Sequence, residues 1–178
     1  MAHENLINWK VTWTAPNVGW LKANWDMAIN KDQGRVGISV IIRDEKGRVV
    51  VAMSRTRLGL LEPTTGEALG AFQATRLILE LGWHNIILEG DAKQIVVAIN
   101  SDTSMWSKYG QLVDEPRHLL HTLYRWKCSF ISREANEATH KLAKAAATDI
   151  SDIIWRDQIS NYINNIVLIE QLTLSVDS

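Results

Sequence analysis

Apolar and polar side chains alternate along three successive segments in the first third of the chain. In residues 20–28 one face carries Leu21, Ala23, Trp25 and Met27, and the other carries Lys22, Asn24, Asp26 and Ala28. This period of two predicts a half-buried strand. Residues 36–42 repeat the alternation, and residues 48–54 return as a third strand. Residues 44–47 between them predict a hairpin turn, so we expect three antiparallel strands.

Helical and short apolar segments follow one another in the rest of the chain. We expect helices at residues 64–81, 92–100, 111–124 and 134–147, and short apolar strands at residues 85–88 and 126–132. Pro116 predicts either that the third helix starts near Glu115 or that it is kinked there. This order of elements predicts an α/β fold with a five-stranded mixed sheet, its first three strands antiparallel, flanked by helices.

The length of 178 residues suits one domain with tails. We expect an N-terminal tail at residues 1–19, a domain at 20–150 and a C-terminal extension at 151–178. In that extension, the apolar stretch 163–176 is broken by polar residues and predicts a tail that packs or frays. We also expect a monomer.

Composition describes an ordinary soluble globule, with 46% hydrophobic and 22% charged residues. Most of the eight tryptophans are expected in the core. Cys128 is the only cysteine, which suits a reducing compartment. The first ten residues lack an apolar leader, and no apolar run is long enough to span a bilayer. We therefore expect an intracellular protein, nuclear or cytoplasmic, that is neither secreted nor in a membrane.

Three carboxylates stand at positions where a mixed sheet brings side chains together. Asp26 lies on the less apolar face of the first strand, Glu67 in the first turn of a helix and Asp91 at the end of the fourth strand. Such hard oxygen ligands suit Mg²⁺ or Mn²⁺. Two ions in such a cluster would support hydrolysis of a phosphodiester.

Each carboxylate also has a structural alternative. Glu67 follows Thr64 by three residues, the spacing of a capping box. Asp91 precedes a helix and is a candidate N-cap, and Asp26 is a candidate solvent-facing residue of an edge strand. Taken singly, these alternatives are favoured, and only the joint placement of the three residues favours a metal site.

Four segments of the chain resemble, in order, the conserved blocks of type 1 ribonuclease H. They are residues 22–28, 65–68, 88–92 and 133–143. The resemblance runs from about Trp20 to Ala147 and is greatest to plant domains found alone or at the end of retroelement reverse transcriptases. It implies a ribonuclease H-like fold, an RNA–DNA hybrid as the partner, and cleavage of the RNA strand with two Mg²⁺ ions.

The resemblance also assigns roles to individual residues. Asp26 matches the carboxylate that bridges two metals, and Glu67 and Asp91 match two further ligands. A fourth carboxylate is expected four residues after Asn136, where this chain has His140. Imidazole binds Mn²⁺ better than Mg²⁺, so His140 as a catalytic ligand would favour Mn²⁺. The alternative, of equal weight, is a surface histidine beside an inactive site.

Substrate contacts are expected from small groups and a few cations, because hybrids are recognised by shape, phosphate and 2′-hydroxyl groups. The candidates are Met27, Ala28, Lys93, Asn136 and Arg117. Met27 stands where the family commonly has glycine. Its larger side chain would leave less space for the RNA strand to approach the backbone. For the basic residues a solvated helix face is the simpler alternative. The net charge of −1 argues against tight non-specific binding.

Three functions are compatible with these observations. The first is a metal-dependent endonuclease that hydrolyses the RNA strand of RNA–DNA hybrids. The second is a catalytically weakened nucleic-acid-binding module of retroelement origin, favoured by His140 and by the lack of a histidine in residues 130–133, where the family often has one. The third keeps the fold but makes the chain a relative of 3′–5′ exonucleases or integrases.

Overall fold

Six strands form one mixed sheet in the computed structural model, which describes residues 11–104, 107–149 and 152–176. The strands are β1 (Leu21–Asn30), β2 (Arg35–Arg43), β3 (Val49–Leu58), β4 (Asn85–Gly90), β5 (Arg125–Phe130) and β6 (Ile153–Arg156). Their order across the sheet is β5-β4-β1-β2-β3-β6. The first three strands pair antiparallel, whereas β4 and β5 run parallel to β1. The predicted mixed sheet is therefore confirmed.

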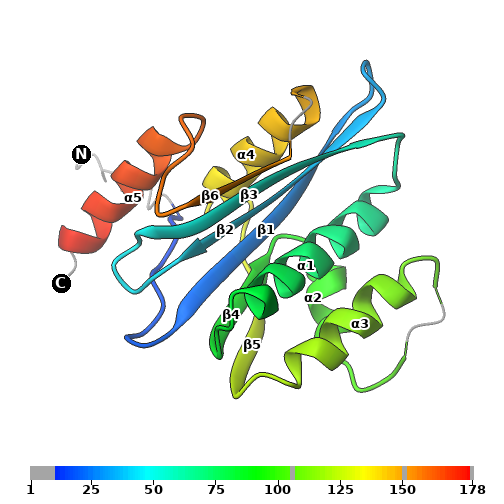
Figure 1. Ribbon diagram of the computed structural model, residues 1–178, viewed down its shortest axis with the longest axis horizontal. Coiled ribbons are helices and arrows are strands. Elements are labelled where there is room, and N and C mark those ends of the chain that lie inside the picture. The colour runs from blue at the N-terminus through cyan, green and yellow to red at the C-terminus, as the bar shows by residue number, and fades with distance from the viewer. Residues whose placement is uncertain (1–10, 105–106, 150–151, 177–178) are drawn as a thin grey trace, which may run out of the picture.

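Helices cover both faces of this sheet (Figure 1). They are α1 (Pro63–Glu80), α2 (Lys93–Asn100), α3 (Gly110–Leu120), α4 (Glu137–Thr148) and α5 (Asn164–Val176). The main core lies between the sheet and α1, α2 and α3, and includes the fully buried Trp25. A smaller core lies on the other face, where Ile41 and Ala52 contact α4 and α5. The central strands β1 and β2 are thus buried on both faces.

This three-layer arrangement changes the interpretation of β1. The alternation along β1 sends Trp25 into the main core and Asn24 and Asp26 to the opposite face. That opposite face is covered as well, so Asn24 is 0% exposed and Asp26 is 1% exposed. The prediction of a half-buried strand is wrong, and Asp26 is not a solvent-facing residue of an edge strand, because β1 is central.

The C-terminal region adds a strand and a helix that were not predicted. The segment β6 pairs antiparallel with β3, which makes six strands instead of five. The four residues of β6 are too few for an alternating pattern to predict a strand. The segment is extended because it pairs with the outer edge of β3. Ile163, just before α5, and Val167 of α5 pack into the smaller core, so the stretch 163–176 packs rather than frays over its described residues.

Local details separate the remaining alternatives. The helix α3 begins at Gly110 and contains Pro116 in its interior, so a start near Glu115 is wrong. The predicted hairpin turn is confirmed, since the backbone N–H of Gly47 donates to the carbonyl oxygen of Asp44 and Gly47 has a φ of 72°.

No helix in the described part of the chain combines the length and apolar character that a bilayer span requires.

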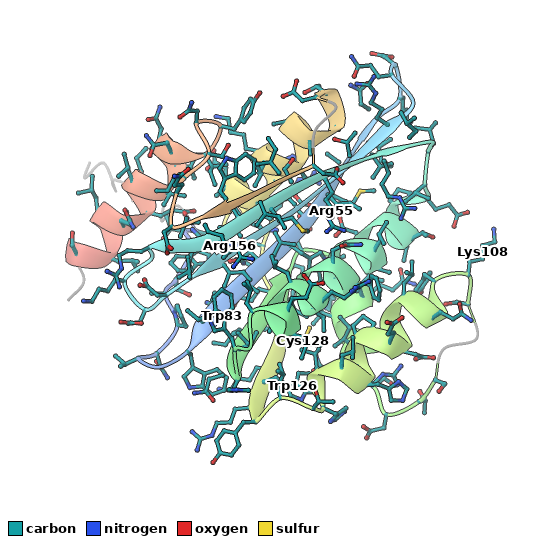
Figure 2. The ribbon with its side chains drawn as sticks, viewed as in Figure 1. Arg55, Trp83, Lys108, Trp126, Cys128 and Arg156 are labelled. Carbon is teal, nitrogen blue, oxygen red and sulfur yellow. The ribbon has the colours of Figure 1, made fainter. Side chains whose placement is uncertain are left out.

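The tryptophans divide between the core and its margins. Trp13 and Trp25 are buried, and four others, Trp20, Trp83, Trp126 and Trp155, are partly buried. Figure 2 shows Trp83 and Trp126 beside β4 and β5. Trp9 and Trp106 lie outside the described residues. The buried Trp13 donates from Nε1 to Oδ1 of Asn24 at 2.9 Å, which fixes the segment before β1 to the sheet.

Close packing of α4 on the sheet depends on one glycine in β2. A Cβ atom on Gly37 would lie 2.1 Å from the carbonyl oxygen of Ala143 and 2.3 Å from the nitrogen of Ala147. The hydroxyl of Ser39 donates to the carbonyl of Thr139 at 2.7 Å, one position before His140. The missing side chain of Gly37 thus allows α4 to approach β1 and β2 closely, which places His140 near Asp26.

Candidate active site

The three carboxylates predicted from the sequence meet at the end of β4. Ligand oxygens of Asp26, Glu67 and Asp91 all lie within 4.8 Å of one another. Residues 89 and 90 of β4 pair in parallel with residues 24 and 25 of β1, so Asp91 directly follows the pairing that ends beside Asp26. The prediction that these residues converge is confirmed.

The first turns of α1 bring Glu67 to the same place. Gly66 packs against Met27, and a Cβ atom on this glycine would lie 2.0 Å from Cε of Met27. The lack of a side chain at residue 66 therefore allows the start of α1 to approach β1. Met27 fills the space beside this glycine and is only 6% exposed. A glycine at residue 27 would leave that space empty.

Neither Glu67 nor Asp91 caps the helix near which it lies. The N-cap of α1 is Glu62 and that of α2 is Ala92, and neither helix has a side-chain cap hydrogen bond. The capping box of Thr64 and Glu67 and the N-cap role of Asp91 are therefore wrong. Oε2 of Glu67 is buried without a hydrogen-bond partner. A buried, unpaired carboxylate oxygen costs free energy unless something outside the protein binds it.

Burial and mutual repulsion both act on the carboxyl groups of Asp26 and Glu67. Burial raises the pKa of Glu67 to about 9, and the charges of Asp26 and Asp91 add to the shift. Burial and the charge of Asp91 also raise the pKa of Asp26, against a hydrogen bond from the backbone of Met27 and the nearby His140. Three carboxylates in such a small, partly buried space favour a bound cation.

His140 lies beside the carboxylates, at the start of α4. Its Nδ1 is 2.7 Å from Oδ2 of Asp26, and its side chain is 17% exposed. Within the described residues, the group of possible metal ligands comprises the three carboxylates without His140. Nη2 of Arg133 lies 3.2 Å from each ring nitrogen of His140. No role for Arg133 was predicted from the sequence, although this residue opens the fourth block that resembles ribonuclease H.

The predicted substrate contacts lie in different environments. Asn136 is 0% exposed, and its amide donates to the carbonyl of Trp25 at 3.0 Å. Its side chain therefore holds α4 against β1, which contradicts a substrate contact. The side chains of Met27 and Ala28 are buried, with 6% and 8% exposed. Lys93 is exposed and lines a cavity of about 290 Å³ together with Glu67, Asp91 and Arg133.

Arg117 also has a structural role. Its side chain is 8% exposed, and its guanidinium donates to the carbonyl oxygens of Ser101 and Thr103 at 2.8 and 2.9 Å and to the carboxylate of Asp114. These contacts tie the loop after α2 to α3. The predicted contact between Arg117 and a phosphate is therefore wrong, because three protein oxygens already accept hydrogen bonds from both terminal nitrogens of its buried guanidinium.

The single cysteine does not extend the site. Cys128 lies on β5 (Figure 2) and is free. Burial raises the pKa of its thiol to about 12, and the charge of Glu89 adds to the shift. A thiol with this pKa stays protonated at neutral pH and is a poor nucleophile. Cys128 is therefore not a candidate for chemistry at this site.

Comparison with solved structures identifies the architecture. The RNase H1 of the halophilic archaeon Halobacterium salinarum NRC-1 is 20% identical, with a TM-score of 0.65 over 73% of this chain and 98% of that one. The N-terminal RNase H domain of Rv2228c from Mycobacterium tuberculosis is 16% identical, with a TM-score of 0.63 over 72% of this chain and 96% of that one. At these identities the likeness concerns the fold.

A third solved structure contains nucleic acid. LC11-RNase H1, crystallised in complex with an RNA/DNA hybrid, is 18% identical and has a TM-score of 0.62, over 72% of this chain and 96% of that one. Among curated proteins, none matches this chain. The profile of the reverse transcriptase-like family matches residues 24–146, which include the three carboxylates, Arg133 and His140. The chain therefore belongs to the reverse transcriptase-like family and has a ribonuclease H-like fold.

Proposed function

We propose that this protein is a metal-dependent endonuclease that hydrolyses the RNA strand of RNA–DNA hybrids. The observation that carries the proposal is the convergence of Asp26, Glu67 and Asp91, whose ligand oxygens lie within 4.8 Å of one another. Membership of the reverse transcriptase-like family and the ribonuclease H-like fold support it. The hybrid bound by LC11-RNase H1 is the model for the substrate class.

The residues at the site fit a divalent cation. All three side chains offer carboxylate oxygens, the ligands that Mg²⁺ and Mn²⁺ prefer, and Oε2 of Glu67 has no hydrogen-bond partner in the protein. Asp26, Glu67 and Asp91 would hold the ion. A divalent cation bound there would activate a water and offset negative charge at the scissile phosphate. The fold contributes by holding the three acids together before any ion binds.

Cations around the carboxylates are suited to hold the nucleic acid backbone. Lys93 and Arg133 line the cavity of about 290 Å³ beside Glu67 and Asp91. A second cavity of about 410 Å³ lies between the end of β1 and α4, and its lining includes Ala28, Lys31 and Lys144. We assign these basic side chains to phosphate contacts, in place of Arg117. Backbone groups near Met27 and Ala28 remain proposed contacts to the RNA strand.

An end-labelled RNA–DNA hybrid tests the proposal. Purified protein with Mg²⁺ or Mn²⁺ is expected to yield internal RNA fragments, and Asp26→Asn is expected to lower the rate at least about 100-fold, because one ligand charge is removed. Thermal unfolding of the variant shows that it remains folded. Mononucleotides released from one end would instead indicate the exonuclease alternative. Absence of cleavage with either metal, from folded wild-type protein, contradicts the proposal.

A second candidate function is a nucleic-acid-binding module descended from a plant retroelement domain. The observation that favours it is His140, which contacts Asp26 and Arg133 at the position where a fourth carboxylate is expected. This candidate predicts that the protein binds a hybrid without cutting it, and that Asp26→Asn leaves the affinity unchanged. A binding titration in parallel with the cleavage experiment distinguishes the two functions.

A further inference from the structure

A basic and aromatic surface lies where β4 and β5 begin, whereas Asp91 follows the end of β4. The parallel strands β1, β4 and β5 lie side by side (Figure 1) and all begin at this end. The side chain of Asn85 donates to the carbonyl of Gly19 at 3.1 Å, and the backbone N–H of Arg125 donates to the carbonyl of His84 at 3.0 Å. The residues that precede the three strands therefore meet there.

Four side chains form this surface, which we call the β5 surface: Trp20, Tyr124, Arg125 and Lys127. The ring of Tyr124 is 76% exposed, and the guanidinium of Arg125 lies 5.1 Å from its centre. Nζ of Lys127 lies 5.3 Å from the centre of the partly buried Trp20 ring. Trp126 packs against the main core, so its two basic neighbours lie on the other face of β5, where both are exposed.

Carboxylates are missing from the parts of the chain that build the β5 surface. Three segments contribute to this end of the sheet and contain no aspartate or glutamate: residues 11–25, 81–88 and 116–133. Glu89 of β4 is only 8% exposed, and its carboxylate pairs with Lys22 at 3.1 Å. Among the described residues, no carboxylate pairs with Arg125 or Lys127. In a chain of net charge −1, this surface is locally positive and fits a polyanion.

An exposed aromatic ring beside two cations fits a single strand of nucleic acid. The bases of a single strand can stack on aromatic side chains while cations contact the phosphates. The bases of a duplex are already stacked on one another, so a duplex would leave the Tyr124 ring unused. An acidic peptide would pair with the two cations but would also leave this ring without a stacking partner.

We propose that the β5 surface binds single-stranded RNA or DNA, with a base stacked on Tyr124 and phosphates held by Arg125 and Lys127. The six residues of β4 place this surface about 20 Å from Asp91, at about 3.3 Å a residue. One substrate can therefore contact both places, with its hybrid duplex at the carboxylates and a single-stranded extension on the β5 surface. That use rests on the proposed function, whereas the binding of single strands does not.

Fluorescence anisotropy of the full chain in a chelator, with labelled oligothymidylate and oligouridylate of about 12 nucleotides, tests this inference. Tyr124→Ala is expected to weaken binding at least about fivefold, because a base loses its stacking contact, and Tyr124→Phe is expected to keep the wild-type affinity. Lys127→Ala should lower the slope of log affinity against log salt by about 0.7. The matched control is Tyr162→Ala, which removes a tyrosine that is 53% exposed and donates to Asp149. This control should bind like the wild type.

Failure of the wild-type protein to bind either strand would overturn the inference. Equal affinities of Tyr124→Ala and wild type would also overturn it, as would tighter binding of a polyglutamate peptide than of either strand. If Tyr124→Ala does not fold, the salt slope of Lys127→Ala decides, and an unchanged slope contradicts the inference. The measurement needs neither metal nor cleavage. Protein that binds single strands but cuts no hybrid therefore contradicts the proposed function and leaves this inference standing.

Discussion

Glu67 illustrates how folding changes the chemistry of a single residue. In the sequence its spacing from Thr64 favours a helix cap, and nothing local distinguishes it from a surface acid. In the fold it lies beside Asp26 and Asp91, and one of its oxygens is buried without a partner. Folding therefore moves this carboxyl group from water into a site where its charged form is unfavourable without a cation.

The stability of the metal-free protein should depend on pH through Glu67. Its pKa rises from an ordinary 4.5 to about 9, so the folded state binds more protons than the unfolded state between these values. This contribution is complete below 4.5 and is lost as the pH rises through 9. Thermal unfolding in a chelator is expected to show a Tm that falls across this range.

The variant Glu67→Gln should largely remove that dependence, because it has no proton to lose. At pH 9 its Tm is expected to exceed that of the wild type by on the order of 3–6 °C, as a gain of one to two kcal/mol would produce. Glu115→Gln, at an exposed position of α3, is the control and should keep the wild-type slope. Parallel curves for Glu67→Gln and wild type would contradict the assignment.

At the scale of secondary structure elements, α5 is held to the sheet by a buried ion pair. Arg43 of β2 is 1% exposed, and its guanidinium pairs with Glu170 of α5 and lies 3.6 Å from the centre of the Trp13 ring. Burial lowers the pKa of Arg43 to about 10, although the charge of Glu170 opposes this shift. The pair thus joins three segments that are distant in sequence: residue 13, β2 and α5.

Removal of the acidic partner should destabilise the protein strongly. Glu170→Ala leaves the Arg43 guanidinium buried without its carboxylate, and the free energy of unfolding is expected to fall by about 3–5 kcal/mol. Urea denaturation measures the loss. The control is Glu80→Ala, which removes an exposed pair with Arg76 at 3.6 Å and is expected to cost less than about 1 kcal/mol. Equal losses in the two variants would show that α5 does not depend on this pair.

At the scale of the whole molecule, charge is nearly balanced. The net charge is −1, and the positive side chains assigned to phosphate contacts are few. Affinity for a hybrid duplex should therefore come from a small number of contacts near the carboxylates rather than from the general field of the protein. Arg117 is not among these contacts, since its two terminal guanidinium nitrogens already donate to protein oxygens.

The salt dependence of hybrid binding should reflect the small number of phosphate contacts. Each phosphate contact contributes about 0.7–0.9 to the slope of log affinity against log salt, so a slope of about 2–4 is expected for Lys93, Arg133, Lys31 and Lys144. Lys93→Ala should reduce the slope by about 1. Lys46→Ala, in the exposed turn between β2 and β3, should leave it unchanged. Fluorescence anisotropy in the presence of Ca²⁺ measures the slope for each variant. Equal slopes for the two variants would contradict the assignment of Lys93.

The sequence by itself determined the order of elements as far as α4 and the mixed sheet, because periodicity and local turn chemistry depend on neighbours along the chain. The three acidic residues were predicted from their joint placement in that order and from the resemblance to ribonuclease H. The sequence also marked residue 140 as the departure from the expected ligand set. Only the tertiary structure decided that β1 is buried on both faces, that β6 and α5 complete the fold, and that Arg117 and Asn136 have structural roles. It also decided that Arg133 faces His140. These outcomes depend on contacts between residues distant in sequence, and no local pattern records which partners a side chain meets after folding.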